Sequence, residues 1–233
     1  MRFNMKKFWS YIENDKYGVG CTGQTVYLYD KNGTELAKFK DLPYAYKPAF
    51  SPNSNIFIVK TTEGRLAVYS LDTLSLIKKF RYSKVDGAQD DGFCFSSDGK
   101  YFINVERQGD ELHSAISVYD TDDFTRISQL LLGDRMMISH IELVDGEYYV
   151  LGFMRGSNGV LSDCFVGKFT ENDIKEVHLI SEREHEFYND YFSLKIMGFT
   201  EKAYEWDHFE ITLDKLKNAN HSLANLWKYY DEK

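Results

Sequence analysis

The densest group of ionisable side chains in the sequence is the run Ser181–Glu186 (SEREHE), which Phe187–Asp190 (FYND) follows. Two carboxylates, Glu184 and Glu186, flank His185, and such a group could bind a cation or hold a protonated imidazole. A run of charges without apolar periodicity is also typical of a solvated loop. We therefore expect a charged surface loop here, with the chemical interpretation as the alternative.

Paired carboxylates raise a second kind of chemistry, because acid–base and glycoside-hydrolysing sites use two of them. Asp122-Asp123 falls in a repeating turn, where Asp is favoured for its local hydrogen bonds to the backbone, so we assign that pair to structure. Asp90-Asp91 has no such assignment. The alternative function is therefore a hydrolase or lyase with its site in an axial channel. Its carboxylate and imidazole groups would come from Asp90, Asp91, Glu184, His113 and His185.

Sequence motifs for other chemistry do not occur. There is no Walker loop, GxGxxG, GxSxG or HExxH. Cys21, Cys94 and Cys164 are far apart and form no CxxC pair, so neither a zinc site nor a disulfide framework is indicated. We expect buried, inert thiols, no catalytic residue, no metal ligand and no cofactor.

Charge and hydropathy narrow the expected partners and location. The formal net charge is −8 and the pI is about 5.3, whereas nucleic-acid-binding domains usually carry a basic patch. No secretory signal is evident, and no stretch approaches the roughly 20 apolar residues of a membrane span. We expect a cytoplasmic protein that binds neither nucleic acid nor membrane.

A weak motif recurs along the chain: a strand-like segment, an acidic or amide turn, then in most copies one large apolar residue. From Asn32 through Asp72, Asp122, Glu171 and Asp214 the steps are 40, 50, 49 and 43 residues. A four-stranded propeller blade has a period of roughly 40 to 50 residues. The spacing therefore predicts stacked four-stranded antiparallel units.

We predict an all-β, propeller-like fold of about five such blades in a single domain, 1–233, with a short C-terminal helix near 213–230. Strand-like segments in the last unit are Tyr191–Met197, Ala203–Trp206 and Phe209–Leu213. Either an N-terminal strand near Phe3–Tyr11 joins the last blade, or the helix covers an open edge. The predicted units are 1–42, 43–84, 85–134, 135–183 and 184–217.

Two units carry a family resemblance. Residues 50–77 (FSPNSNIFIVKTTEGRLAVYSLDTLSLI), with 95–106 and 116–127, resemble blades of the WD-repeat and YVTN-type β-propeller superfamily. In that superfamily a first strand ends in Ser-Pro-Asp-Gly and a third strand reads Val-Tyr-Asp. The repeats here are degenerate, because the Gly-His and terminal Trp-Asp dipeptides are absent from their expected places. The resemblance implies a rigid scaffold for partners and supplies no catalytic residues.

Propeller geometry would gather the loops between blades and the loops between second and third strands on one face. Those segments contain many more carboxylates than basic residues, together with several aromatic residues. We therefore predict a non-catalytic module that binds a protein partner, possibly a basic one, since complementary charge speeds encounter and aromatic residues make hot spots. An ordinary solubilising surface and a small-molecule ligand are the alternatives. The predicted partner-binding residues are Tyr44, Tyr46, Asp90, Asp91, Asp110, Glu111, Glu184, Glu186 and Tyr188.

Overall fold

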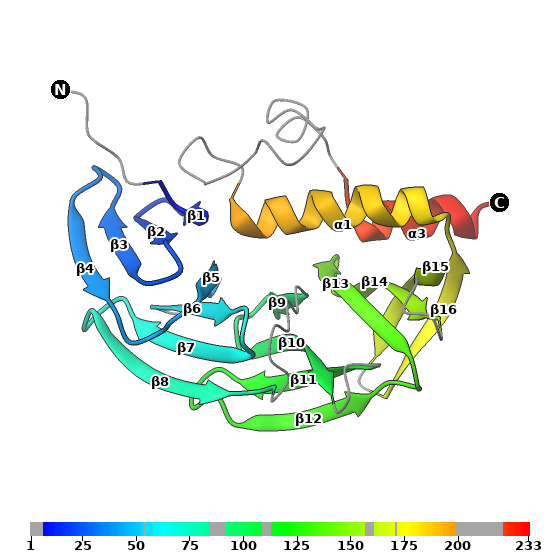
Figure 1. Cartoon of the computed structure of the whole chain (residues 1–233), viewed down its shortest axis with the longest axis horizontal. Helices are drawn as coiled ribbons and strands as arrows, with labels where there is room; N and C mark the ends of the chain where they lie inside the picture. The colour runs from blue at the N-terminus through cyan, green and yellow to red at the C-terminus, as the bar shows by residue number, and fades with distance from the viewer. Residues whose placement is uncertain are drawn as a thin grey trace. The chain divides into compact units, whose positions relative to one another are not determined.

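The structure is a computed structural model, and its strands and helices are labelled in Figure 1. It describes residues 7–53, 55–83, 92–108, 113–156, 161–170, 172–198 and 221–233. The chain divides into two compact units, which are described separately. Unit 1 comprises Met1–Tyr82 and Tyr191–Ala219, and unit 2 comprises Ser83–Asp190 and Asn220–Lys233.

Unit 1 contains two four-stranded antiparallel sheets, each connected in chain order. The strands of the first sheet are β1 (Ser10–Glu13), β2 (Tyr17–Cys21), β3 (Val26–Asp30) and β4 (Glu35–Phe39). Those of the second are β5 (Ala45–Phe50), β6 (Ile56–Thr61), β7 (Arg65–Ser70) and β8 (Ser75–Arg81). One core joins both sheets, and in it the rings of Phe57 and Tyr69 stack with centroids 4.9 Å apart.

Unit 2 repeats this arrangement. Its first sheet consists of β9 (Phe93–Phe95), β10 (Tyr101–Gln108), β11 (His113–Asp120) and β12 (Arg126–Leu131). Its second sheet consists of β13 (Met136–Val144), β14 (Glu147–Arg155), β15 (Leu161–Thr170) and β16 (Asp173–Leu179). A core cluster that includes Ile103, Ile116, Val150 and Phe165 joins the two sheets.

The described residues include two helices, α1 (Glu182–Met197) and α3 (Leu223–Asp231). In unit 2, α3 packs on β14, β15 and β16. The indole Nε1 of Trp227 donates to the carbonyl oxygen of Glu176 at 2.7 Å. The Nζ of Lys168 lies over the same indole, 4.0 Å from a ring centroid. Neither helix has the length and hydropathy that a membrane span requires.

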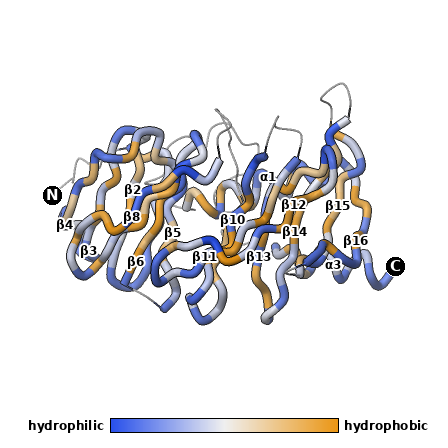
Figure 2. Tube along the Cα trace, turned by 90° about the horizontal axis from the view of Figure 1, so that it is seen from below, coloured by the Kyte–Doolittle hydropathy of each residue, from blue (hydrophilic) through white to orange (hydrophobic). Residues whose placement is uncertain are grey.

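In all four sheets the second and third strands contain an unbroken run of at least three buried residues, and the fourth strand has no buried residue. A strand covered on both faces reads as a nearly continuous apolar run, as in FIV of β6 and YVL of β14. Figure 2 shows this as hydrophobic colour along the strands and hydrophilic colour at the turns. The repeated blade architecture predicted from the sequence is thus confirmed.

The recurring turn motif has a common structure in several sheets. The side chain of the last residue of the third strand accepts a backbone N–H from the turn: Asp120 Oδ1 accepts from Asp122, and Ser70 Oγ from Thr73. Leu74 and Phe124, the single large apolar residues of the motif, then adopt positive φ, at 50° and 53°. This conformation costs roughly 1–2 kcal/mol, and Phe124 offsets it by burying its ring.

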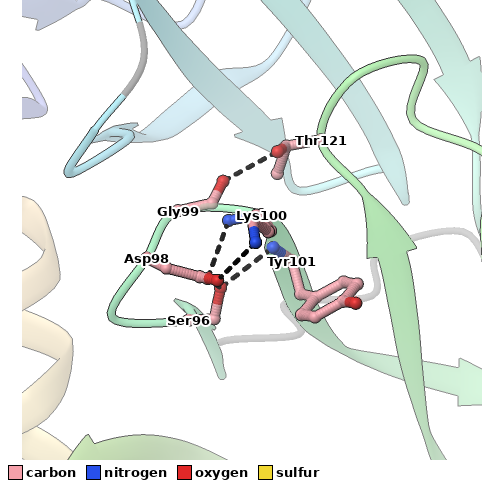
Figure 3. Close-up of polar contacts among 6 residues, drawn as sticks. All are labelled: Ser96, Asp98, Gly99, Lys100, Tyr101 and Thr121. Atoms are coloured by element: carbon pink, nitrogen blue, oxygen red, sulfur yellow. Dashed lines mark hydrogen bonds and ion pairs between the residues drawn. The ribbon is translucent and has the colours of Figure 1, made fainter.

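The turn between β9 and β10 has the sequence Ser-Ser-Asp-Gly, residues 96–99 (Figure 3). Ser96 Oγ donates to the Asp98 carboxylate at 2.7 Å and accepts the N–H of Tyr101 at 2.9 Å. Gly99 takes the left-handed conformation with φ +69°, and its carbonyl accepts the Thr121 hydroxyl at 2.7 Å. The Ser96 hydrogen bond, with the Lys100 N–H, lowers the pKa of Asp98. These side-chain hydrogen bonds therefore stabilise the turn of the hairpin.

Four sheets, not five, are present in the described residues. The predicted loop at Glu182–Asp190 and the predicted strand Tyr191–Met197 are both wrong, because these residues form α1. The predicted strands Ala203–Trp206 and Phe209–Leu213 lie outside the described residues. The C-terminal helix is confirmed as α3, which Ser222 caps by accepting the N–H of Asn225 at 3.0 Å.

The start of α1 shows why the loop prediction failed. Ser181 and Glu184 form a capping box: the Ser181 N–H donates to Glu184 Oε2 at 3.0 Å, and the Glu184 N–H donates to Ser181 Oγ at 3.2 Å. These hydrogen bonds satisfy two backbone N–H groups at the start of the helix, so the segment is helical despite its many charged residues. The first sheet is completed by β1, an N-terminal strand that pairs with β2.

Candidate functional site

Unit 2 contains a pocket of about 490 Å³, which is in the range of roughly 300–1,000 Å³ usual for ligand sites. Its walls come from β10, β13, β14 and β15 and from the first half of α1. The residues that line it are Arg107, Met137, Ile138, Ser139, Phe153, Leu161, His185, Glu186, Asn189 and Asp190.

A β-bulge at Ser139 brings two residues of β13 into contact with α1 beside this pocket. Ile138 pairs with Gly152 and His140 pairs with Leu151, so Ser139 is an extra residue in β13. Successive side chains normally point to opposite faces of a sheet, but a bulge redirects them. Here Ser139 Oγ contacts His185 Nε2 at 3.1 Å, and His140 Nε2 contacts the Asn189 carbonyl at 3.1 Å. Two consecutive residues of one strand therefore bond to the same helix.

His185 is held in this contact as a neutral imidazole. Its side chain is only 3% exposed, and burial lowers its pKa to about 4. Its ring meets the edge of Phe153 at a centroid distance of 5.3 Å and an angle of 80°. A Ser–His pair is also the nucleophile–base arrangement of many hydrolases. Among the described residues, however, no carboxylate hydrogen-bonds the other ring nitrogen, so the contacts seen here are those that position the helix.

Four carboxylates form what we call the acidic ridge: Asp163 of β15 and Glu182, Glu186 and Asp190 of α1. The three on α1 are spaced by four residues and so share one face of the helix. Burial, together with the charges of Glu182, Asp163 and Glu186, raises the pKa of the Cys164 thiol to about 11. All three carboxylates therefore lie near enough to Cys164 to act on its thiol.

The acidic ridge is not neutralised in the described part of the chain, where no ion pair includes any of its four residues. Burial raises the pKa of Asp190, and the charge of Glu186 raises it further. Like charges four residues apart destabilise a helix by roughly 0.2–0.5 kcal/mol per pair. Repulsion between Glu186 and its neighbours thus opposes the stability of α1, although Glu182 in the first turn is itself favoured by the helix dipole.

Metal chelation does not explain the ridge. Within the described ranges no three His, Cys, Asp or Glu side chains are grouped closely enough to hold a metal ion. The carboxylates are spread along two turns of helix and one strand, which suits an extended partner with several positive charges better than one ion.

The predicted residues of α1 lie on different faces of the helix. Glu186 belongs to the acidic ridge and lines the pocket. Glu184 instead accepts the Tyr230 hydroxyl at 2.7 and 2.8 Å, and Tyr188 packs against His221 at 5.7 Å, on the side of α1 that meets the C-terminal segment. Burial opposes ionisation of Glu184, but the hydrogen bonds from Ser181 and Tyr230 prevail and lower its pKa.

The remaining predicted residues are not part of this site as described. Tyr44 and Tyr46 belong to unit 1, where Tyr44 is 46% exposed and the Tyr46 hydroxyl donates to the Met197 sulfur at 3.2 Å. Four others lie outside the described residues: Asp90, Asp91, Asp110 and Glu111.

Sequence reasoning missed Arg107, Ser139 and Asp163, which come from three separate strands and carry no shared motif. The α1 part of the ridge did leave a signal. Glu182, Glu186 and Asp190 have helical spacing, and Ser181-x-x-Glu184 is the sequence signature of a capping box.

Comparison with known proteins supports the fold. No family model matches the chain, and no curated protein matches its sequence. A solved structure of hydrazine synthase from Kuenenia stuttgartiensis is similar, with a TM-score of 0.60 and 15% identity. The match covers 78% of this chain and 51% of that one, so the chain spans about half the length of this structural relative. At this identity the likeness shows the fold alone.

Proposed function

We propose that this chain is a non-catalytic interaction module whose acidic ridge binds a basic protein or peptide. The observation that carries the proposal is the ridge itself: three carboxylates along one face of α1 and a fourth on β15, with no ion-pair partner in the described residues. Charge complementarity of this kind steers association and sets specificity. The net charge of −8 favours a basic protein over nucleic acid.

In this proposal the sheets serve as the rigid support, consistent with the resemblance to WD-repeat and YVTN-type propellers. The ridge is mounted on them by the Ser139–His185 and His140–Asn189 hydrogen bonds. A binding surface whose side chains are fixed in advance loses less conformational entropy when a partner arrives.

The test is titration of a fluorescent lysine- and arginine-rich peptide, read by anisotropy at low and at moderate salt. The ridge variant Glu182→Gln/Glu186→Gln is compared with Asp122→Asn/Asp145→Asn, which removes the same charge from exposed turns. Asp145 has φ 52°, a conformation that Asn tolerates. We expect the ridge variant to bind about tenfold more weakly at low salt, since each exposed ion pair contributes up to about 1 kcal/mol.

The control variant is expected to bind as the wild type does. Equal weakening by both variants would mean that only overall charge matters, and absence of wild-type binding at low salt would reject the interaction module.

A hydrolase is the second candidate, and the Ser139–His185 contact within the pocket is the observation that favours it. In such an enzyme His185 Nε2 would accept the proton of Ser139 Oγ as the oxygen attacks an ester carbonyl carbon. The alcohol of the ester would leave with that proton, and water would then hydrolyse the acyl-serine. Hydrolysis of p-nitrophenyl acetate tests this candidate. Turnover above the buffer rate that Ser139→Ala abolishes would support it, and turnover that persists in Ser139→Ala would reject it.

A further inference from the structure

The pocket of unit 2 is apolar at its buried end. Met137 and Ile138 of β13 line it and are only 4% and 5% exposed, and the half-buried Phe153 of β14 and Leu161 of β15 extend this hydrocarbon surface. We call these four side chains the apolar wall. A cavity of about 490 Å³ with such a wall can enclose an aliphatic side chain, whose burial favours binding.

The polar groups beside the apolar wall are neutral and already hydrogen-bonded. Ser139 Oγ and His185 Nε2 contact each other at 3.1 Å, and burial lowers the pKa of His185 to about 4, so its ring carries no charge near neutral pH. Asn189 contacts His140 through its carbonyl and its side-chain oxygen, at 3.1 and 3.2 Å. A cation placed at this end of the pocket would lose its hydration without gaining a counter-charge.

The carboxylates of the pocket lie at its exposed side. Glu186 is exposed and Asp190 is half-buried, and neither takes part in an ion pair within the residues that the structure describes. They are four residues apart on one face of α1, so one ammonium group with three N–H donors can bond to both. We call this pair the acidic rim. Arg107 also lines the pocket, but it is already engaged within the protein and is not counted among the ligand-binding groups.

An apolar wall inside an acidic rim determines the order of groups in a fitting ligand. A lysine side chain carries its charge at the far end of an aliphatic stem, so its ammonium group would enter first and reach the apolar end of the pocket. The N-terminal residue of a peptide carries its ammonium group and its side chain on the same carbon atom. That side chain can contact Met137 and Ile138 while the ammonium group stays beside Glu186 and Asp190.

We infer that the pocket of unit 2 captures the free N-terminus of the partner, with an apolar first residue. The α-ammonium group bonds to the acidic rim, and the first side chain packs on the apolar wall. The following residues leave along the acidic ridge, where Glu182 lies about one turn before Glu186 and outside the pocket. Capture of an N-terminal amine is a recurring mode of peptide recognition. The assignment of this terminus rests on the proposed function, since it specifies which end of the basic partner the ridge would hold.

Fluorescence anisotropy with the wild-type chain tests the inference. The probe is the peptide Leu-Gly-Lys-Gly-Lys-Gly-Lys with a free N-terminus and a C-terminal fluorescein. We expect N-acetylation to weaken binding about tenfold, because it removes a charged hydrogen-bond donor. A peptide with a free N-terminus and Gln in place of its last Lys has the same net charge as the acetylated peptide, and we expect it to lose only about threefold.

The first side chain is tested in the same way. Replacing the first Leu of the peptide by Ser is expected to weaken binding about tenfold, because the apolar wall then covers no aliphatic group. Leu161→Ser, which shortens the wall, is expected to weaken the Leu-first peptide several-fold and to leave the Ser-first peptide unchanged. Leu131→Ser changes an exposed leucine of β12 outside the pocket and is expected to alter neither peptide.

Two charge variants separate the pocket from the rest of the ridge. Asp190→Asn, at the acidic rim, is expected to weaken the free-amine peptide more than the acetylated one. Glu182→Gln, on the ridge outside the pocket, is expected to weaken both peptides by the same factor. Both changes are at exposed or half-buried positions, and the comparisons between peptides on the wild-type chain depend on no variant.

Three outcomes would decide against this terminus. Equal affinity of the free-amine, acetylated and Ser-first peptides would overturn the inference and leave the ridge as a site for basic peptides. If L-leucinamide displaces the labelled peptide with an affinity equal to that of the peptide, the occupant is a small amine and the inference is again wrong. Absence of binding by every peptide would reject the proposed function together with the inference.

Discussion

Two pockets of similar size, one in each unit, differ in how far their polar groups are already hydrogen-bonded or ion-paired within the protein. The pocket of unit 1, about 390 Å³, lies among turns and includes Asn14 and Asn55. Asn14 Oδ1 accepts the N–H groups of Lys16 and Tyr17, and Asn55 Nδ2 donates to Asp72 at 2.7 Å. The pocket of unit 2 has carboxylates with no ion-pair partner in the described residues. Charged residues line both pockets, but Asp15 and Lys16 of unit 1 lie between β1 and β2, whereas Glu186 and Asp190 of unit 2 lie on helix α1.

The largest effect is expected from detaching α1. His185→Ala removes a buried ring that contacts Phe153 and Ser139, so we expect the free energy of unfolding to fall by about 2–4 kcal/mol. Urea denaturation of the full chain measures it. A loss below about 1 kcal/mol would mean that the helix is held elsewhere, and the pocket of unit 2 would then be no better organised than that of unit 1.

A smaller loss is expected from the turn in unit 1. Asn14→Ala removes the acceptor of two backbone N–H groups in an exposed turn, which costs about 0.5–1.5 kcal/mol. Asp15→Asn in the same turn is the control, and as an exposed surface change it is expected to stay within about 0.5 kcal/mol. Equal effects of the two changes would show that Asn14 is not committed to the turn.

Glu184 gives a prediction about pH. Its folded-state pKa is lowered, so its contribution to stability is complete above its ordinary pKa of 4.5 and is lost as pH falls through the folded value. Glu184→Gln, which keeps a side-chain oxygen for the capping box, is expected to flatten the acid side of the stability profile. Thermal unfolding between pH 3 and pH 7 checks this, and an unchanged slope would contradict the role given to the carboxylate.

The smallest effect has the opposite sign. The pKa of Asp190 is raised, so its ionisation opposes folding as pH rises through the folded value. Asp190→Asn is therefore expected to stabilise the protein at neutral pH by about 0.2–0.5 kcal/mol, by removing the repulsion from Glu186. Chemical denaturation at pH 7 measures it. An unchanged or lower stability would contradict the repulsion assigned to this pair of carboxylates.

The sheets were predictable from the sequence because their turns are closed by local chemistry. Ser96, Asp98 and Gly99 act within a few residues of one another, and the motif that ends at Phe124 sets its own backbone conformation. Such interactions are visible in a short window of sequence, and they recur at the period of the blade.

The candidate site was not predictable in the same way. Its lining joins Arg107 to α1 across about 80 residues of chain, and no local pattern encodes that proximity. In the first turns of α1 the buried residue is His185, a polar one, so hydrophobic periodicity gave no helix. The capping box was the available local signal, and the charge run obscured it.

The extra residue at the bulge of β13 sets which side chains reach α1 as well as how β13 pairs with β14. Deleting one residue there would restore strict alternation, and only one of the two neighbours could then face α1. The sheet would survive such a deletion, but either the serine or the histidine contact to the helix would be lost. Keeping both contacts therefore requires the extra residue of β13 as well as the side chains of Ser139 and His140.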